Sequence, residues 1–207
     1  MRSTYCNTIP LQPQYVHMIL QWFDADSVHM PSRSGGFRYI IDLVDNLMGW
    51  VEARVLHKLR ATVIVDFLFE VMCHFGCIFQ LTCNNGTEFK GTVKELMCKY
   101  NVPVVHISPY NSQANGKIKR MQCTYIEAIW KVLQGKMDQW PLWLGYALWV
   151  DRITVKRNIG YSPYYLLYGQ HPLLPFDITD STFHMLDWPK VTTTKDLLAL
   201  QIQQLDQ

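Results

Sequence analysis

Three short polar stretches of the sequence carry the side chains that could do chemistry. They read WFDADSVHMP at 22–31, LTCNNGTEF at 81–89 and YNSQANGKIKR at 110–120. The first contains Asp24 and Asp26, which share one side of a strand because side chains alternate along it. Hard divalent cations take carboxylate oxygens as ligands. Asp26 is therefore a candidate metal ligand, and the alternative is an ordinary aspartate that caps a turn at a strand end.

The second stretch interrupts a strand-like run with Asn84, Asn85 and Gly86. Asn and Gly tolerate positive φ, so a tight turn is the simplest interpretation. This turn presents the uncharged amide of Asn84 at its start. Glu88 follows a turn or so later and is the nearest carboxylate in the sequence.

The third stretch begins a long predicted helix with a polar and basic strip. Its members are Gln113, Asn115, Lys117, Lys119, Arg120 and Lys131. Such a strip can contact nucleic-acid phosphates, and the alternative is a solvated helix face. The formal net charge of +2 and the pI near 8.2 do not by themselves indicate nucleic-acid binding. The local charge is therefore the observation that supports it.

The elements that must position these stretches follow from the periodicity of the apolar residues. We expect strands within 15–28, 37–45, 49–56, 77–82 and 102–107, and helices within 59–75, 87–100, 113–134 and 140–155. The first strand should end on its acidic residues and lead into the turn MPSRSGG, and the strand at 102–107 should be buried. This order predicts a mixed α/β fold with an antiparallel meander followed by parallel strands. The polar breaks after the first and fourth strands should then lie close together beside the long helix.

Composition and length bound the organisation of the chain. A chain of 207 residues with 49% hydrophobic residues can bury one substantial core. We expect an N-terminal tail or linker at 1–17, one domain at 18–160, an extended arm at 161–190 and the start of a truncated helix at 191–207. No apolar run suggests a signal peptide or a membrane span, so we expect an intracellular protein without membrane contact. The six cysteines show no zinc-binding spacing and should be reduced thiols.

Together the stretches WFDADSVHMP, TCNNGTEFKG and SPYNSQANGKIKR resemble the integrase catalytic core of LTR retrotransposons, most of all the gypsy-type elements of fungi. The resemblance runs from about residue 20 to about residue 183 and includes GGFRYI, GWVEAR and GYSPYYLLYG. It implies an RNase H-like fold with a five-stranded mixed sheet flanked by helices. It also implies metal-dependent phosphoryl transfer on DNA, with Mg²⁺ or Mn²⁺ as the cofactor.

The resemblance places three catalytic carboxylates of that family on Asp26, Asn84 and Lys119. Asp26 is intact, whereas Asn84 replaces an Asp and Lys119 replaces a Glu. The formal charge of the three positions changes from −3 to zero, because Asp26 contributes −1, Asn84 nothing and Lys119 +1. Two like unit charges about 4 Å apart repel each other by about 4 kcal/mol at an effective dielectric of about 20. The charge of Lys119 would oppose each of the two charges of a divalent ion by this amount. We therefore expect a retrotransposon integrase core without bound metal and without catalytic activity.

Two alternatives remain open from the sequence. The chain could be a non-catalytic DNA-binding, RNA-binding or dimerisation module, with a homodimer formed through the apolar helix at 140–155. It could also be a residual metal-dependent nuclease or strand transferase, in which Glu88 or Asp24 stands in for a missing ligand. Under the resemblance the partner is DNA, contacted by the strip that begins at Gln113, and the location is nuclear.

Overall fold

The computed structural model describes residues 18–107, 124–133, 139–179 and 193, and within them five strands form one mixed sheet. The strands are β1 (Trp22–Ser34), β2 (Phe37–Asp45), β3 (Val51–Leu56), β4 (Gln80–Cys83) and β5 (Val104–His106). β1, β2 and β3 pair antiparallel, while β4 pairs parallel with both β1 and β5. The spatial order β3-β2-β1-β4-β5 is the mixed five-stranded sheet that the sequence predicted.

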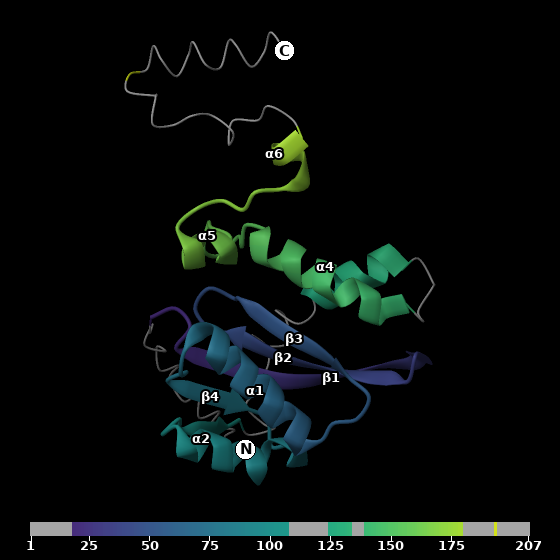
Figure 1. The fold of residues 1–207 in the computed structure, drawn as a ribbon, viewed down its shortest axis with the longest axis vertical. Coiled ribbons are helices and arrows are strands. Elements are labelled where there is room, and N and C mark those ends of the chain that lie inside the picture. Colours follow the sequence, from purple (N-terminus) through teal and green to yellow (C-terminus); the bar gives the residue numbers. More distant parts are fainter. Residues whose placement is uncertain (1–17, 108–123, 134–138, 180–192, 194–207) are drawn as a thin grey trace, which may run out of the picture. The chain divides into compact units, whose positions relative to one another are not determined.

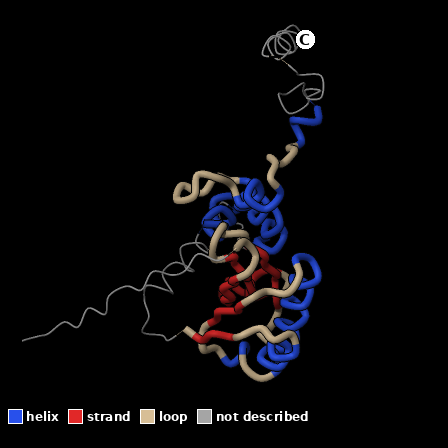
Figure 2. The backbone as a smooth tube through the Cα atoms, turned by 90° about the vertical axis from the view of Figure 1, so that its left-hand side faces the viewer, coloured by secondary structure: helices blue, strands red, loops and turns tan. Residues whose placement is uncertain are grey.

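Helices cover both faces of this sheet, as Figures 1 and 2 show. The helices are α1 (Ala61–Phe75), the 3-10 turn η1 (Thr87–Phe89), α2 (Thr92–Lys99), α4 (Trp140–Ile153), α5 (Pro163–Tyr168) and α6 (Pro175–Thr179), and residues 124–133 are also helical. α1 and α2 pack on one face, whereas α4 and the helical residues 124–133 pack on the other. None of the helices in the described ranges is long and apolar enough to cross a membrane.

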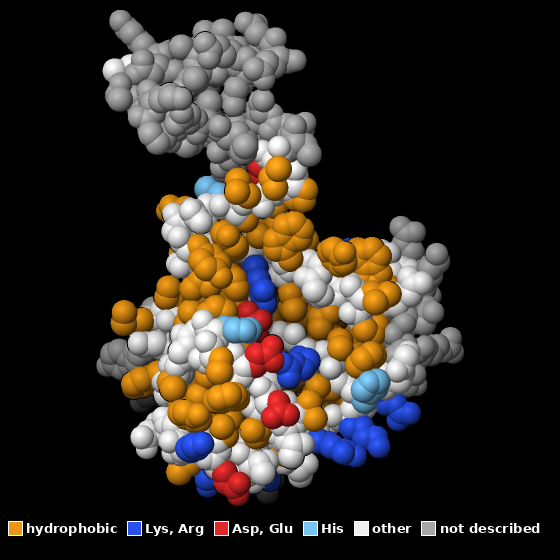
Figure 3. Space-filling model, viewed as in Figure 1, with side chains coloured by type: hydrophobic (Ala, Val, Ile, Leu, Met, Phe, Trp, Pro, Cys, Tyr) orange, Lys and Arg blue, Asp and Glu red, His pale blue; other side chains and the backbone are white. Residues whose placement is uncertain are grey.

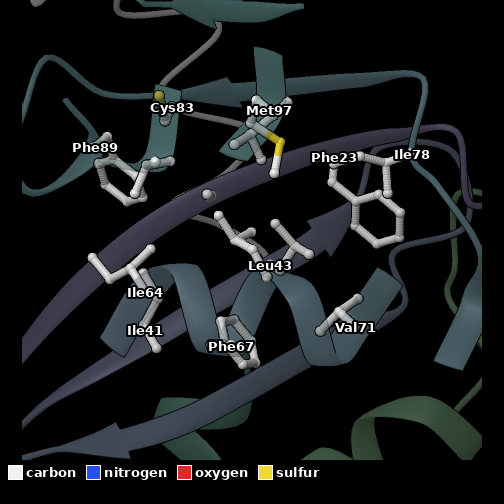
Figure 4. Close-up of a cluster of buried hydrophobic side chains, with 14 of the residues drawn as sticks. Phe23, Ile41, Leu43, Ile64, Phe67, Val71, Ile78, Cys83, Phe89 and Met97 are labelled. Carbon is white, nitrogen blue, oxygen red and sulfur yellow. The ribbon is translucent and has the colours of Figure 1, made fainter. Parts of the chain in front are cut away.

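The first hydrophobic core lies between the sheet and α1 (Figure 4). α1 buries side chains at intervals of three and four residues, so that one stripe of the helix faces the sheet. The stripe consists of Ile64, Phe67, Leu68, Val71 and Met72. It meets Phe23, Ile41 and Leu43, which point toward α1 from β1 and β2 (Figure 4). Gly76 ends the helix, as predicted, with its backbone N–H bonded to the carbonyl of Met72.

The second core lies on the opposite face, where Tyr125, Ile129 and Leu133 follow one another at intervals of four residues. They pack with Ile40 and Val44 of β2 and with the buried side of α4. β2 is therefore buried on both faces, which explains its nearly continuous apolar sequence. Both cores bury the central strands from which the polar stretches emerge.

Two expectations about strands are wrong. β1 does not end on its acidic residues, because pairing with β2 extends it past Asp26 to Ser34 and the hairpin turns at Gly35 and Gly36. The ladder of hydrogen bonds to β2 sets the length of β1, so the acidic residues do not stop the strand. β5 is not buried, since it lies at the edge of the sheet and Val105 is 43% exposed.

The chain divides into two compact units, Met1–Pro163 and Tyr164–Gln207. In the second unit α6 is helical where an extended arm was expected, and its start is closed by the backbone N–H of Leu174, which donates to Asp177 at 2.8 Å. The predicted tail at 1–17 and the predicted terminal helix at 191–207 lie outside the described residues, apart from residue 193.

Candidate functional site

The parallel pairing of β1 with β4 brings Asp26 and Asn84 together. The last paired residues of the two strands are Ala25 and Cys83, so the residues that follow them, Asp26 and Asn84, lie side by side. Asn84 Nδ2 donates a hydrogen bond to Asp26 Oδ1 at 2.7 Å. Both residues are half-buried. The two polar stretches that the sequence singled out thus form one site, in which an amide contacts the carboxylate.

A second hydrogen bond fixes which end of the Asn84 amide faces Asp26. Asn84 Oδ1 accepts the backbone N–H of Gly86 at 2.8 Å, which closes a short turn. Rotating the amide would set two oxygens against each other and two N–H groups against each other. The group that Asn84 directs at Asp26 is therefore a hydrogen-bond donor, which cannot ligate a metal.

The turn that holds Asn84 does not use positive φ, contrary to the expectation from its Asn-Asn-Gly sequence. Gly86 has φ −56°, and neither Asn84 nor Asn85 is in the left-handed region. The physical reason is the side-chain hydrogen bond from Gly86 to Asn84, which forms the turn with ordinary backbone angles. A Cβ on Gly86 would lie 2.5 Å from the Glu88 carboxylate, so glycine leaves room for that side chain.

Glu88 reaches the same site through Ser27. Ser27 Oγ donates to Glu88 Oε1 at 3.2 Å, and the backbone N–H of Ser27 donates to Asp26 Oδ1 at 2.8 Å. Asp26 Oδ1 therefore accepts two hydrogen bonds, one from Ser27 and one from Asn84. The carboxylates of Asp26 and Glu88 flank Ser27, so the structure brings one of the proposed substitute carboxylates close to Asp26.

Asp42 and Tyr125 belong to the surroundings of the site, and sequence reasoning missed both. Asp42 lies directly opposite Asp26 in the β1–β2 ladder and is completely buried. Tyr125 Oη donates to Asp42 Oδ2 at 2.6 Å. Burial, followed by the charge of Asp42, raises the pKa of Tyr125 well above its ordinary value. The available signal was an Asp at an inward-facing position of an apolar strand, between Ile40 and Val44.

Cys83 and His106 lie next to the site, and His106 contacts both Cys83 and Asn84. Cys83 Sγ lies 3.4 Å from His106 Nδ1, which is also 3.2 Å from the carbonyl oxygen of Asn84. Burial, followed by the negative charges of Glu88 and Asp26, raises the pKa of Cys83 from 9.0 to about 12. Cys83 is therefore a neutral structural thiol at neutral pH, in agreement with the expected reduced cysteines.

The donor set of this site does not fit a pair of divalent ions. A two-metal centre needs several negatively charged oxygens that converge on both ions. Asp26 faces the NH₂ group of Asn84 instead of a second carboxylate. Within the described ranges no three His, Cys, Asp or Glu side chains are arranged so as to hold a metal ion. Lys119, the predicted third position, lies outside the described residues.

Most of the predicted nucleic-acid strip also lies outside the described residues. This holds for Gln113, Asn115, Lys117, Lys119 and Arg120. Lys131 is exposed on the helical residues 124–133, whose inner side carries Tyr125 and Ile129. The apolar helix predicted at 140–155 is α4, and its outer side exposes Leu142, Tyr146 and Val150.

The chain is similar in sequence to parts of retroviral polyproteins, although no family model matches it. It is 32% identical over 152 residues to the Gag-Pol polyprotein of avian reticuloendotheliosis virus, which covers 72% of this chain and 13% of that protein. It is 30% identical over 167 residues to the Pol polyprotein of radiation murine leukemia virus (strain Kaplan), covering 79% of this chain and 28% of that protein. The chain thus spans less than a third of the length of these relatives.

Three solved structures share the fold. The BIV integrase catalytic core matches with a TM-score of 0.59 and 20% identity, covering 71% of this chain and 93% of that one. The HTLV-2 integrase catalytic core in complex with magnesium matches with a TM-score of 0.60 and 14% identity. This match covers 72% of this chain and 97% of that one. A chain of the simian T-cell lymphotropic virus intasome in complex with a PP2A regulatory subunit matches with a TM-score of 0.63 and 17% identity. This match covers 76% of this chain and 58% of that one. These matches confirm the predicted RNase H-like fold.

Proposed function

We propose that this chain is the integrase core of an LTR retroelement and that it is catalytically inactive. The proposal rests on its RNase H-like fold, shared with retroviral integrase catalytic cores, and on its similarity to part of retroviral Pol polyproteins. The gypsy-type assignment rests on the motifs GGFRYI, GWVEAR and GYSPYYLLYG. The chain retains the scaffold that positions DNA chemistry in this family and lacks the charge that the chemistry requires.

The observation that carries this proposal is the hydrogen bond from Asn84 Nδ2 to Asp26 Oδ1 at 2.7 Å. An Asp at position 84 would turn an oxygen toward Asp26, and two facing carboxylates would be held together by a divalent cation between them. The amide removes the need for that cation, because its N–H group satisfies the carboxylate directly. Asn84 thus stabilises the metal-free site.

Lys119 adds a second obstacle at the third catalytic position. The resemblance places it where the family has a Glu, so an ammonium group stands where a metal ligand is required. A divalent ion would lose one favourable interaction and gain one unfavourable interaction, each of about 4 kcal/mol per unit charge at about 4 Å. The two replacements act in the same direction, and we therefore propose that neither Mg²⁺ nor Mn²⁺ binds productively.

One contact favours a second candidate function, a residual metal-dependent nuclease or strand transferase. Ser27 bridges Glu88 to the Asp26 carboxylate, because its Oγ donates to Glu88 Oε1 and its backbone N–H donates to Asp26 Oδ1, so two carboxylates remain in the site. One metal ion held by Asp26 and Glu88 would require Ser27 Oγ and Asn84 to release their present hydrogen bonds. The first candidate keeps all of these bonds and is the better supported.

The partners follow from the same proposal. DNA is the expected ligand of the basic strip that includes Lys117, Arg120 and Lys131, and the proposed location is nuclear. Self-association through the exposed apolar side of α4 is proposed because Leu142 and Tyr146 are 72% and 62% exposed there.

A strand-transfer and nuclease assay tests this function. The unmodified chain, Asp26→Ala, Glu88→Gln and the double variant Asn84→Asp with Lys119→Glu are each incubated with labelled duplex DNA and Mg²⁺ or Mn²⁺. The proposal predicts no ion-dependent product from the first two chains. Ion-dependent activity of the unmodified chain that disappears in both Asp26→Ala and Glu88→Gln would establish the second candidate instead.

A further inference from the structure

A basic groove lies beyond the candidate site, where the tip of the β1–β2 hairpin meets the loop that joins β3 to α1. Two cavities of about 620 and about 310 Å³ adjoin there and share His57 and Lys58 as lining residues. Figure 3 shows Lys, Arg and His side chains gathered at this edge, over the loop between β3 and α1. We call this surface, lined by Arg38, His57, Lys58 and Arg60, the hairpin groove.

The cations of the hairpin groove lack acidic partners in the part of the chain that the structure describes. None of the described residues that line the two cavities is an Asp or a Glu. Arg54, which also lines the smaller cavity, pairs with Glu70 and lies 5.3 Å from the centre of the Phe67 ring. Arg38, Lys58 and Arg60 are exposed, and no ion pair within the described ranges involves them. Their combined charge therefore faces solvent and favours an anionic ligand.

The groove is also held in shape. The His57 ring stacks on Phe37 with a centroid distance of 4.0 Å and an interplanar angle of 18°. Gly36 has φ +84°, and a Cβ at this residue would lie 3.3 Å from His57 Nδ1. Glycine at residue 36 therefore suits both the positive φ of the hairpin turn and the close approach of the imidazole. α1 begins at Ala61 with no acidic residue in its first turn, so its N-terminal dipole adds to the positive potential.

The groove lies apart from the candidate site. Asp42 lies opposite Asp26, and Tyr39 is three residues earlier on the same strand, about 10 Å along β2 and, at this odd spacing, on the other face of the sheet. Tyr39 lines the larger cavity beside Arg38. A duplex is a rigid polyanion whose successive phosphates can contact several of the groove's cations at once, which a small anion cannot do.

We propose that the hairpin groove binds the phosphate backbone of double-stranded DNA through Arg38, Lys58 and Arg60, as a contact surface separate from the basic strip of the long helix. The choice of DNA among polyanions rests on the proposed function, whereas the groove itself rests on the cavities and the unpaired cations. Backbone contacts of this kind set position and affinity and carry no sequence preference.

The test measures binding of a fluorescent 20-base-pair duplex by anisotropy at several salt concentrations. The chains are the unmodified protein, a triple variant (Arg38→Ala, Lys58→Ala, Arg60→Ala) and its charge-preserving counterpart (Arg38→Lys, Lys58→Arg, Arg60→Lys). Arg157→Ala is the matched control, because Arg157 is an exposed cation outside the hairpin groove. It lies in the loop after α4, and Arg152 attaches α4 to Val51, at the end of β3 opposite the groove. Thermal melting of each chain verifies that it is folded.

The triple alanine variant should bind the duplex about tenfold or more weakly at 50 mM salt, and its slope of log affinity against log salt should be smaller by about 2 to 3. The charge-preserving and Arg157→Ala chains should keep the slope of the unmodified protein. An unchanged slope in the triple alanine variant overturns the proposal, as does a failure of the unmodified chain to bind DNA. A loss confined to heparin or to anionic vesicles, with DNA binding intact, overturns it as well.

Failure of the groove and failure of the proposed function give different results. If the groove proposal alone is wrong, the triple alanine variant binds DNA normally while the chain with Asn84→Asp and Lys119→Glu gains binding of divalent ions. If the proposed function alone is wrong, the triple alanine variant loses DNA binding while the unmodified chain shows activity that depends on Asp26.

Discussion

At the scale of single residues, Asn84 differs from an aspartate by one NH₂ group in place of an oxygen. That group makes the shortest side-chain contact of Asp26, at 2.7 Å, and the remaining amide oxygen is bound by the backbone of Gly86. The substitution therefore leaves the backbone of the turn in place and changes the interaction from one that needs a cation to one that excludes it.

Asn84→Asp should destabilise the protein when divalent ions are removed with EDTA. The change replaces a hydrogen bond to a charged group by two facing carboxylates, so the free energy of unfolding should fall by about 1 to 3 kcal/mol. Urea denaturation at neutral pH measures this value. Asn85→Asp is the matched control, because Asn85 is exposed and, among the described residues, hydrogen-bonds to the Ile107 carbonyl at 3.3 Å and not to Asp26. Equal stability of the two variants would contradict the proposed role of Asn84.

Tyr125→Phe should also destabilise the protein, because Asp42 is fully buried and would lose the 2.6 Å hydrogen bond from the phenol. The expected loss is about 1.5 to 3 kcal/mol, the usual range for a hydrogen bond to a charged group. Tyr146→Phe serves as the control, since Tyr146 is 62% exposed. In an Asp42→Asn background the cost of Tyr125→Phe should be smaller. An equal cost in both backgrounds would show that the phenol acts by packing alone.

The buried thiol of Cys83 predicts a loss of stability in alkali. Its pKa is raised from 9.0 to about 12, so the folded state favours the neutral thiol. This contribution is fully present below pH 9 and is lost as the pH rises from 9 toward 12. Denaturation curves at pH 8, 9 and 10 should therefore show a steeper decline for the unmodified chain than for Cys83→Ala. Parallel declines would contradict the raised pKa.

At the scale of secondary structure elements, Arg152 attaches α4 to the edge of the sheet. Its Nη2 donates to the Val51 carbonyl at 2.7 Å and pairs with Glu52 at 2.9 Å, and its guanidinium lies 4.6 Å from the centre of the Trp50 ring. One planar fork thus joins the helix to three consecutive residues at the start of β3. A lysine has no such fork and cannot make these contacts together.

Arg152→Ala should lower the free energy of unfolding by about 2 to 3 kcal/mol, because the Val51 carbonyl and one oxygen of the Glu52 carboxylate lose the guanidinium donor. Arg152→Lys should recover less than half of the loss. Chemical denaturation of both variants measures these values, with Arg157→Ala expected within about 0.5 kcal/mol of the unmodified chain. Full recovery by lysine would indicate that charge alone attaches α4.

Elements with strong periodicity could be predicted from the sequence, and those that depend on distant pairing could not. α1 was expected within 59–75 and occupies Ala61–Phe75, since its apolar stripe and Gly76 are local signals. β1 was expected to stop at its acidic residues and continues to Ser34, because its partner strand β2 decides its length. The exposure of β5 follows from the order of the whole sheet, which no local pattern records.

At the scale of the whole molecule, the sequence predicted that the polar breaks of two strands lie together but not which groups interact there. Asp26 and Asn84 were expected to meet, since each follows the paired part of a parallel strand, and the structure places them in contact. The orientation of the amide depends on Gly86, and the buried carboxylate of Asp42 becomes part of the site only through its register with Asp26. Such details require the paired structure.

The measurement that tests the central claim most directly is the melting temperature of four chains with and without Mg²⁺ or Mn²⁺. The chains are the unmodified protein, Asn84→Asp, Lys119→Glu and the double variant. Ligand at about 100 times its dissociation constant stabilises a protein by about 2.7 kcal/mol, which corresponds to roughly 5 to 10 °C for a domain of this size.

We predict that the unmodified chain melts at the same temperature in EDTA and in divalent ions, and that the double variant melts several degrees higher when ions are added. An ion-dependent rise in the unmodified chain, or no rise in the double variant, would contradict the assignment of Asp26, Asn84 and Lys119 as the remains of a metal-binding site.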